Sequence, residues 1–350
     1  MLEGFASAAL GWPSLTAGPE HNGRTVPRGT ETSVPRGTDT DAPEATVSGT
    51  GHAPEPVAHP RAGSGTVPRE TPPAPALPAP ARGTVKPWQG TRVITVSNQK
   101  GGVGKTTTAV NLAAAMAGSG LRVLVIDMDP QGNASTALSI PHSSGTAGIY
   151  DVLIDGVPLA DVVQPCPQVP GLSCAPATID LAGAEIELVP LVARENRLRR
   201  AVQSYLGSAA DPPDLVLIDC PPSLGLLTVN AFVAARELLI PIQCEYYALE
   251  GLSQLLKNVD LIQQHLNADL HVSTILLTMF DGRTRLASDV ADQVREHFGD
   301  RVLRTAIPRS VRISEAPSHG ETVMTYDPTS TGALSYAEAA AEMRRTKEIS

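Results

Sequence analysis

The sequence predicts a doubly wound α/β fold, in which a mostly parallel sheet is covered by helices on both faces. Short apolar runs typical of buried parallel strands recur along residues 91–350. Stretches of helical pattern separate these runs, as crossover connections between parallel strands require. A glycine-rich loop also joins the first apolar run to the first helical stretch, an arrangement typical of such folds.

Each predicted element follows from its own residues. The first strand, 92–98, is β-branched and apolar, and an alanine-rich helix over 106–120 follows it and ends in glycine. A second buried strand covers 121–129. Three further strands are predicted over 214–222, 237–243 and 273–280, and a long helix over 248–266. About 250 residues suit one such domain, and we expect no second folded domain and no helix-turn-helix ahead of it.

Residues 1–90 have a different composition. They hold 15 of the 31 prolines and many small polar residues, and a short phrase beginning Val-Pro-Arg occurs three times. Such a segment buries too little apolar surface to offset its chain entropy. The sequence therefore predicts a disordered Pro/Gly/Thr-rich tail over 1–90 and a folded domain over 91–350. The tail is interpreted as a solvated tether or, alternatively, as an arm that docks on a partner.

Composition excludes several classes of protein. The 350 residues carry a net charge of −9, which argues against general coating of nucleic acid but allows a local basic patch. The four cysteines have no CxxC spacing, so neither a zinc site nor a disulfide framework is predicted. No apolar run is long enough to span a membrane, and the first residues lack the basic start of a secretory signal. We expect a cytoplasmic protein with reduced thiols.

The strongest motif is Ser-Asn-Gln-Lys-Gly-Gly-Val-Gly-Lys-Thr-Thr-Thr at 97–108, between a predicted strand and a predicted helix. Glycines there let backbone N–H groups turn toward phosphate oxygens, and the start of the helix adds its positive end. Lys105 is expected to reach the β- and γ-phosphates, and the Thr106 hydroxyl is expected to bind Mg²⁺. The predicted nucleotide-binding residues of the loop are Lys100, Gly101, Gly102, Val103, Gly104, Lys105, Thr106 and Thr107.

This loop departs from the common phosphate-loop pattern, because Gln99 stands where a glycine is usual and a second lysine, Lys100, follows it. In this form the chain resembles the deviant Walker-A ATPases, within the P-loop NTPase superfamily, and among them the ParA/Soj partition proteins. The resemblance extends from about Arg92 to about Glu342. Besides the loop it rests on the segments at 127–135, 214–225, 241–252, 276–286 and 307–320.

Three carboxylates are expected beside the loop. Asp219 ends an apolar strand at the sheet edge where ligands of open α/β sheets bind, so it is expected to hold Mg²⁺ directly or through water. Asp127 and Asp129 alternate at the end of another strand and share a side of it. The resemblance implies that Asp129 positions the attacking water. It places Asp127 near the metal, although a structural hydrogen-bonding role for Asp127 is the alternative.

The resemblance also implies an ATP-dependent homodimer. In it Lys100 reaches across a nucleotide sandwich to the phosphates of the partner subunit, so Lys100, Lys105 and Asp129 are the predicted catalytic residues. The family pattern further suggests adenine contacts from Met279 and Pro308. Mg²⁺ and ATP are the expected cofactors.

DNA binding is expected although the chain is acidic. Residues 91–350 carry 20 Lys and Arg against 28 Asp and Glu, but 283–312 contain seven arginines against four acidic residues. The family implies non-specific binding of double-stranded DNA by the ATP dimer, which would associate the protein with the nucleoid. The predicted contacts are Arg283 and Arg312, followed by Arg285, Arg309 and Lys257. Asp260, where relatives often place a basic residue, weakens the prediction for the helix that carries Lys257.

The predicted function is ATP-driven segregation of the chromosome origin, in which a ParB-like centromere-binding partner stimulates hydrolysis and releases the dimer from DNA. A related ATPase that positions another cargo over the nucleoid is the main alternative. A MinD-like membrane ATPase is less consistent with the C-terminal tail, which has little bulky apolar surface, and no membrane contact is expected. An ATP-gated adaptor whose own hydrolysis is too slow to matter is the non-enzymatic alternative.

Overall fold

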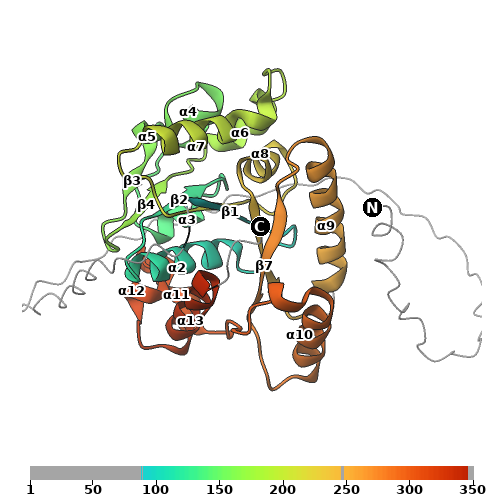
Figure 1. Ribbon diagram of the computed structural model, residues 1–350. Coiled ribbons are helices and arrows are strands. Elements are labelled where there is room, and N and C mark those ends of the chain that lie inside the picture. The colour runs from blue at the N-terminus through green and yellow to red at the C-terminus, as the bar shows by residue number, and fades with distance from the viewer. Residues whose placement is uncertain (1–87, 89, 246–247, 346–350) are drawn as a thin grey trace, which may run out of the picture. The chain divides into compact units, whose positions relative to one another are not determined.

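The computed structural model describes residues 88, 90–245 and 248–345 (Figure 1). All of them belong to one of the two units into which the chain divides, Ala74–Ser350. The tail predicted over 1–90 therefore lies outside the described residues, apart from Trp88 and Gly90. The predictions made for that tail and for the boundary at residue 91 stay predictions.

The described residues form a seven-stranded sheet in the order β3-β4-β2-β5-β1-β6-β7. The strands are β1 (Arg92–Val96), β2 (Val123–Asp127), β3 (Gln164–Pro165), β4 (Leu172–Ala175), β5 (Leu215–Asp219), β6 (Glu237–Gln243) and β7 (His271–Thr278). Every neighbouring pair is parallel except β3 and β4 at one edge, which are antiparallel. The predicted fold class, a doubly wound and mostly parallel sheet, is confirmed.

Helices cover both faces of this sheet (Figure 1). The first face carries α2 (Lys105–Gly118), α3 (Asn133–Ala137), α11 (Val311–Glu315), α12 (Val323–Tyr326) and α13 (Thr331–Arg345). The other face carries α4 (Ile149–Ile154), α5 (Leu159–Val162), α6 (Leu181–Glu187), α7 (Arg197–Ser208) and α8 (Leu226–Ala234), while α9 (Ala248–His265) and α10 (Arg285–Phe298) flank β6 and β7. Successive side chains of a strand point to opposite faces of the sheet, so each strand contributes to both hydrophobic layers. In β5, Leu217 packs toward α2 whereas its neighbour Ile218 packs toward α8.

The core is built from aliphatic side chains and alanine, as the scarcity of aromatic residues requires. Helix α2 buries nearly its whole length, including an unbroken run of alanines over 113–115, and this narrow surface lets α13 approach closely. Tyr336 of α13 is one of the largest fully buried side chains, and its hydroxyl lies 3.5 Å from the Thr108 hydroxyl of α2. Packing of α13 therefore fixes the helix that follows the glycine-rich loop.

The structure differs from the sequence prediction at the ends of the strands and at one edge. The strands predicted over 92–98, 121–129 and 214–222 stop at Val96, Asp127 and Asp219. Just beyond these ends, Ser97 N still donates to the Leu239 carbonyl at 3.1 Å and Met128 N to the Asp219 carbonyl at 2.9 Å, and the chain then enters the loops of the site. The short strands β3 and β4 were not predicted, because two and four residues are too few to show a period.

A buried ion pair ties the beginning of β1 to β6. The Arg92 guanidinium donates from Nε to Glu237 Oε1 at 2.7 Å and from Nη2 to Oε2 at 2.5 Å. Arg92 also donates to the Met343 carbonyl at 3.3 Å and lies over the Trp88 ring at 4.6 Å from its centroid. Burial alone would raise the pKa of Glu237, but the hydrogen bonds and charge of Arg92 outweigh burial and hold that pKa below its ordinary value.

Replacing only one partner of this pair should destabilise the fold. Glu237→Gln leaves the Arg92 charge buried without a counter-ion, which costs about 3 kcal/mol of the free energy of unfolding. The double variant Arg92→Met/Glu237→Met should recover most of that loss, since it removes both charges. Urea unfolding of the single and double variants measures both values, and a single-variant loss below about 1 kcal/mol would contradict the assignment.

The pair also predicts how stability depends on pH. Because folding lowers the pKa of Glu237, its contribution is complete above the unfolded-state pKa of about 4.3 and is lost as the pH falls through the lower folded-state value. The difference in stability between the wild type and Glu237→Gln should therefore shrink on acidification, in urea titrations repeated from pH 7 to pH 3.

Candidate functional site

The loop between β1 and α2 has the backbone geometry of an anion-binding turn. Gly102 and Gly104 adopt positive φ angles of 74° and 86°, which side chains rarely tolerate. Gly104 is the N-cap residue of α2, so no side chain caps the first N–H groups of that helix. The first turn of α2 also contains no acidic residue. These N–H groups are therefore available to an anion, and the positive end of the helix favours one.

Lys105 is buried at the base of this loop. Its Nζ donates to the Lys100 carbonyl oxygen at 3.2 Å, and its side chain is surrounded by the loop and the ends of the neighbouring strands. Burial lowers the pKa of Lys105, while the nearby charges of Asp219 and Asp129 act in the opposite direction. This ammonium group has three donors and contacts one carbonyl oxygen among the described residues, so it has donors left for an anionic ligand.

Lys100, the second lysine of the motif, is engaged by a carboxylate of the same chain. Its Nζ lies 2.8 Å from Glu245 Oε2, with both side chains partly exposed. Its backbone N–H donates to Asn98 Oδ1 at 3.0 Å, and Asn98 in turn donates to the Pro241 carbonyl at 2.8 Å. The roles of Asn98 and Glu245 could not be predicted from the sequence, because their contacts with Pro241 and Lys100 depend on β6 lying beside β1.

Asp219 is the most unusual group of the site. It ends β5 in register with Val96 of β1 and with Asp127 of β2. Both of its carboxylate oxygens are buried and have no hydrogen-bond partner among the described residues. Burial, and next the charge of Asp127, raise the pKa of Asp219 well above its ordinary value, and the nearby Thr106 hydroxyl opposes this rise without bonding to either oxygen.

An unpartnered buried carboxylate is the donor that a hard cation requires. The described residues include no cluster of three or more His, Cys, Asp or Glu side chains that could hold a metal ion by themselves. A cation at Asp219 would therefore draw its other ligands from the Thr106 hydroxyl, water and a bound phosphate. That donor set fits Mg²⁺, which typically uses one or two carboxylates together with substrate phosphates.

Asp127 has a different environment from Asp219. Its Oδ2 accepts hydrogen bonds from Ser135 N at 2.9 Å and Ser135 Oγ at 2.7 Å, and its Oδ1 accepts one from Asp129 N at 3.2 Å. Burial raises the pKa of Asp127 to about 6, against the lowering effect of these hydrogen bonds. The structure thus places Asp127 as an anchor for α3, and the predicted metal contact stays a prediction.

Asp129 lies at the opening of the turn that leads into α3. It is nearly buried, and its Oδ1 accepts a hydrogen bond from Gln131 N at 3.0 Å. Gly132, with φ 62°, passes so close to His142 that an added Cβ would lie 2.7 Å from the ring. One oxygen of Asp129 therefore holds the turn, and the carboxylate lies near enough to Lys105 to act on its pKa.

The two predicted adenine contacts, Met279 and Pro308, lie on two segments that pair with each other just after β7. Met279 adopts φ 50°, and its Cε is 3.9 Å from the position of a Cβ at Gly104. Pro308 pairs with Phe280 in an isolated bridge. Thr278 donates from Oγ1 to the Val103 carbonyl at 2.8 Å and so ties β7 to the loop. Met279 therefore lies against the glycine-rich loop. Pro308 lies beside Phe280, the residue that follows Met279.

The residues predicted to contact DNA are exposed, but they do not form a single cluster. The Arg283 side chain is 90% exposed and forms a bidentate ion pair with Asp281. Its Nε donates to Oδ1 and its Nη2 to Oδ2, each at 2.8 Å. The charge of Arg309 also acts on Asp281, whose pKa falls to about 2 chiefly through Arg283. Arg312 pairs with Glu315 at 3.1 Å and Asp327 at 3.4 Å.

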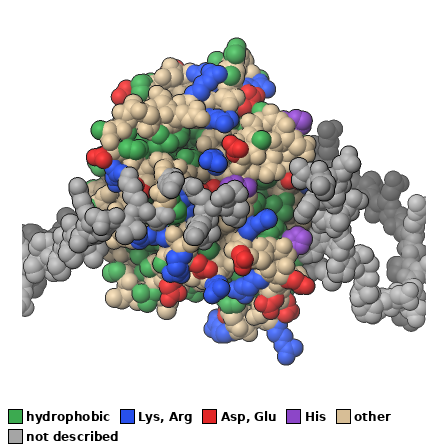
Figure 2. Space-filling model, viewed as in Figure 1, with side chains coloured by type: hydrophobic (Ala, Val, Ile, Leu, Met, Phe, Trp, Pro, Cys, Tyr) green, Lys and Arg blue, Asp and Glu red, His purple; other side chains and the backbone are tan. Residues whose placement is uncertain are grey.

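The remaining two candidates are Arg285 and Lys257. Arg285 is exposed at the first turn of α10, and Lys257 is exposed on α9. Figure 2 shows Lys and Arg intermixed with Asp and Glu in the lower part of the view, where Figure 1 places α10. The surface is thus of mixed charge, with Arg283 and Arg309 gathered around one carboxylate. Among the helices of the described part, none is long and apolar enough to cross a membrane.

Known proteins match the folded part of the chain. A family model described as an AAA domain matches residues 91–272. The sporulation initiation inhibitor protein Soj of Bacillus subtilis is 52% identical over 252 residues, which are 72% of this chain and 98% of that protein. The chromosome partitioning protein ParA of Myxococcus xanthus is 50% identical over 254 residues, covering 73% of this chain and 88% of that protein.

Solved structures agree with this match. A Mycobacterium smegmatis structure described as cobyrinic acid a,c-diamide synthase with bound ATP analog and magnesium has a TM-score of 0.62 and 37% identity, and covers 73% of this chain and 95% of that one. The septum site-determining protein MinD of Pyrococcus horikoshii, complexed with Mg-ADP, has a TM-score of 0.57 and 27% identity over 72% and 96% of the two chains. The chain therefore belongs to the Soj/ParA family of chromosome-partitioning proteins.

Proposed function

We propose that this chain is a Mg²⁺-dependent ATPase that partitions chromosomes. The observation that carries the proposal is the Asp219 carboxylate, which is buried with no hydrogen-bond partner among the described residues, beside a glycine-rich loop whose following helix has no side-chain cap. Family membership supports the partitioning role, and the structural neighbours with bound ATP analog or Mg-ADP support the choice of nucleotide and metal.

Each residue of the site has a distinct part in hydrolysis. The loop N–H groups from Gly101 to Thr107 bind phosphate oxygens, and Lys105 exchanges the Lys100 carbonyl for the β- and γ-phosphates. Thr106 and Asp219 would hold Mg²⁺, which supplies positive charge to the phosphates when bound. Asp129 orients the attacking water with the carboxylate oxygen that does not hold the Gln131 N–H. Most of the catalysis is thus positioning and charge neutralisation.

The position of Lys100 supports the proposed dimerisation. Its bond to Glu245 is a partly exposed ion pair, and such pairs contribute about 1 kcal/mol or less. The triphosphate of a partner subunit is a stronger attraction for the same ammonium group. We therefore expect ATP to draw Lys100 away from Glu245 and across the interface of a homodimer.

DNA binding in this scheme depends on the dimer. The surface around Asp281 offers Arg283 and Arg309, with Arg285 and Arg312 nearby in sequence and Lys257 on α9. One such patch of mixed charge binds double-stranded DNA weakly, but two patches on one dimer act together and multiply the affinity. A ParB-like centromere-binding protein would then stimulate hydrolysis and release the dimer from the nucleoid.

Asp129→Ala should separate ATP binding from ATP hydrolysis. Removing the carboxylate leaves the loop and Lys105 intact but leaves the water without an orienting group, so kcat should fall at least ~100-fold. The variant should still form ATP-dependent dimers, measured by light scattering after size-exclusion chromatography. Steady-state phosphate release, with DNA and the partner protein present, gives the rate.

Asp161→Ala is the matched control, because Asp161 is an exposed carboxylate on α5 away from the loop. It should retain the wild-type rate. A wild-type chain that stays monomeric with ATP and Mg²⁺ would contradict the dimer. If Asp129→Ala released DNA as fast as the wild type, hydrolysis would not be the switch, and the chain would act as an ATP-gated adaptor.

Arg283→Glu should weaken DNA binding without affecting ATP. The substitution reverses the charge of a 90% exposed side chain and leaves Asp281 beside a second carboxylate. We expect the affinity of the ATP dimer for non-specific DNA to fall at least ~10-fold, and its salt dependence to become shallower.

The control is Arg200→Glu, which makes the same charge change at an exposed position on α7, a helix that packs in a different hydrophobic cluster from α10. It should lower DNA affinity far less than Arg283→Glu. Fluorescence anisotropy with a labelled duplex at several salt concentrations measures both variants. Equal losses in the two variants would show that net charge, and not this surface, sets DNA affinity.

A further inference from the structure

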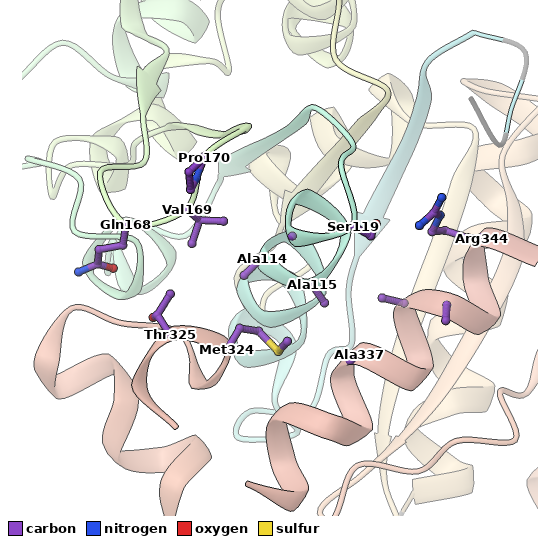
Figure 3. Close-up of a pocket in the computed structure, with 13 residues that line it drawn as sticks. Ala114, Ala115, Ser119, Gln168, Val169, Pro170, Met324, Thr325, Ala337 and Arg344 are labelled. Atoms are coloured by element: carbon purple, nitrogen blue, oxygen red, sulfur yellow. The ribbon is translucent and has the colours of Figure 1, made fainter. Parts of the chain in front are cut away.

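An apolar groove lies between α2 and α13, away from the start of α2 where the nucleotide site is. Its volume is about 410 Å³. Figure 3 shows its walls: Ala114 and Ala115 of α2, Ala337 of α13, Val169 and Pro170 of the loop before β4, and Met324 of α12. The side chains along α2 and α13 are mostly alanine, which leaves a shallow channel between two backbones. Arg344, at one end, is the only charged residue among those that line it.

The described chain begins beside this groove. Trp88 is buried in the same hydrophobic cluster as Ala114 and Ala340, both of which line the groove. The Trp88 ring packs on Arg92, which donates to the carbonyl of Met343, the residue before Arg344. The preceding segment of the chain is therefore tethered close to the Arg344 end.

The segment that precedes Trp88 suits an apolar channel chemically. Residues 74–81 read Ala-Pro-Ala-Leu-Pro-Ala-Pro-Ala, with three prolines, one large apolar side chain and no charge. Proline has no N–H, so such a segment brings few donors that an apolar wall would leave unpaired. In an extended proline-rich segment the carbonyl groups are free acceptors, and the Arg344 guanidinium can donate to them.

The length of the tether also fits. The seven residues from 81 to 88 reach roughly 20 Å when extended. The stretch of α13 from Ala337 to Arg344 is roughly 10 Å long, at the rise of an α-helix. Residues 74–81 can therefore lie along the whole groove while Trp88 stays in place. A tether this short gives an effective concentration in the millimolar range, so even a weak contact would be occupied.

We propose that residues 74–81 of this chain dock in the groove between α2 and α13, with Leu77 seated among its alanines. The relatives support an occupant particular to this chain, because the match to Soj covers 98% of that protein and only 72% of this one. The docked segment would pack against the C-terminal half of α2. Lys105 of the nucleotide site is the first residue of the same helix.

Disulfide trapping in the full-length chain tests the proposal. The pair Leu77→Cys/Ala337→Cys places one thiol in the segment and one at an exposed position in the groove, and the four native cysteines are all buried. Under mild oxidation this pair should form an intramolecular disulfide at least ~10-fold faster than the control pair Leu77→Cys/Leu334→Cys. Leu334 is exposed on the same helix but does not line the groove.

A second control uses the tether itself. Thr84→Cys/Ala337→Cys places the thiol nearer the Trp88 anchor, so it would react at least as fast as position 77 if the segment only diffused near the surface. We expect it to react more slowly. Equal rates at 77 and 84, equal rates with 337 and 334, or disulfides only between two copies would each overturn intramolecular docking.

Thiol accessibility gives a readout that does not need a cross-link. In Ala337→Cys, maleimide labelling should speed up several-fold when Leu77→Asp is added, because the charged side chain expels the segment from the groove. Leu10→Asp, an equivalent change far from the tether, should leave the labelling rate unchanged. Unchanged labelling with Leu77→Asp would overturn the proposal.

Discussion

Two buried carboxylates on adjacent strands are the constraint around which this site is arranged. Asp127 and Asp219 stand in register at the ends of β2 and β5. Ser135 and the Asp129 N–H satisfy Asp127, whereas no described side chain satisfies Asp219. Burying charge in this way is costly unless a cation or proton compensates it. In our account the compensating positive charge comes from Lys105 and from a cation that binds with the nucleotide. Ligand binding therefore neutralises a buried negative charge that the fold alone leaves uncompensated.

Most of the fold could be predicted because its determinants are local. Apolar runs indicate five of the seven strands, and an alanine-rich stretch that ends in glycine indicates α2. The glycine-rich loop was likewise recognisable, because its glycines stand close together in the sequence, and two of them, Gly102 and Gly104, occupy positions with positive φ angles. The edge strand β3 and its neighbour β4 were missed because they are too short to show a period, and their antiparallel pairing depends on the folded sheet.

The parts of the site that could not be predicted are contacts between elements far apart in sequence. Glu245 meets Lys100 across 145 residues, and Thr278 meets the Val103 carbonyl across 175. Two of the arginines predicted for DNA binding also have partners that a charge count does not reveal, since Asp281 pairs with Arg283 while Glu315 and Asp327 both pair with Arg312. Helix α2 connects these observations with the groove, because one end carries Lys105 and the other end lines the channel.

The most direct test of the account is calorimetric measurement of ATP affinity with and without Mg²⁺ in the wild type and in Asp219→Asn. The account predicts that Mg²⁺ tightens ATP binding at least ~10-fold in the wild type, and that Asp219→Asn keeps the metal-free affinity but loses most of the tightening. A similar benefit from Mg²⁺ in both proteins would show that the buried Asp219 carboxylate does not hold the cation, and would contradict the central claim.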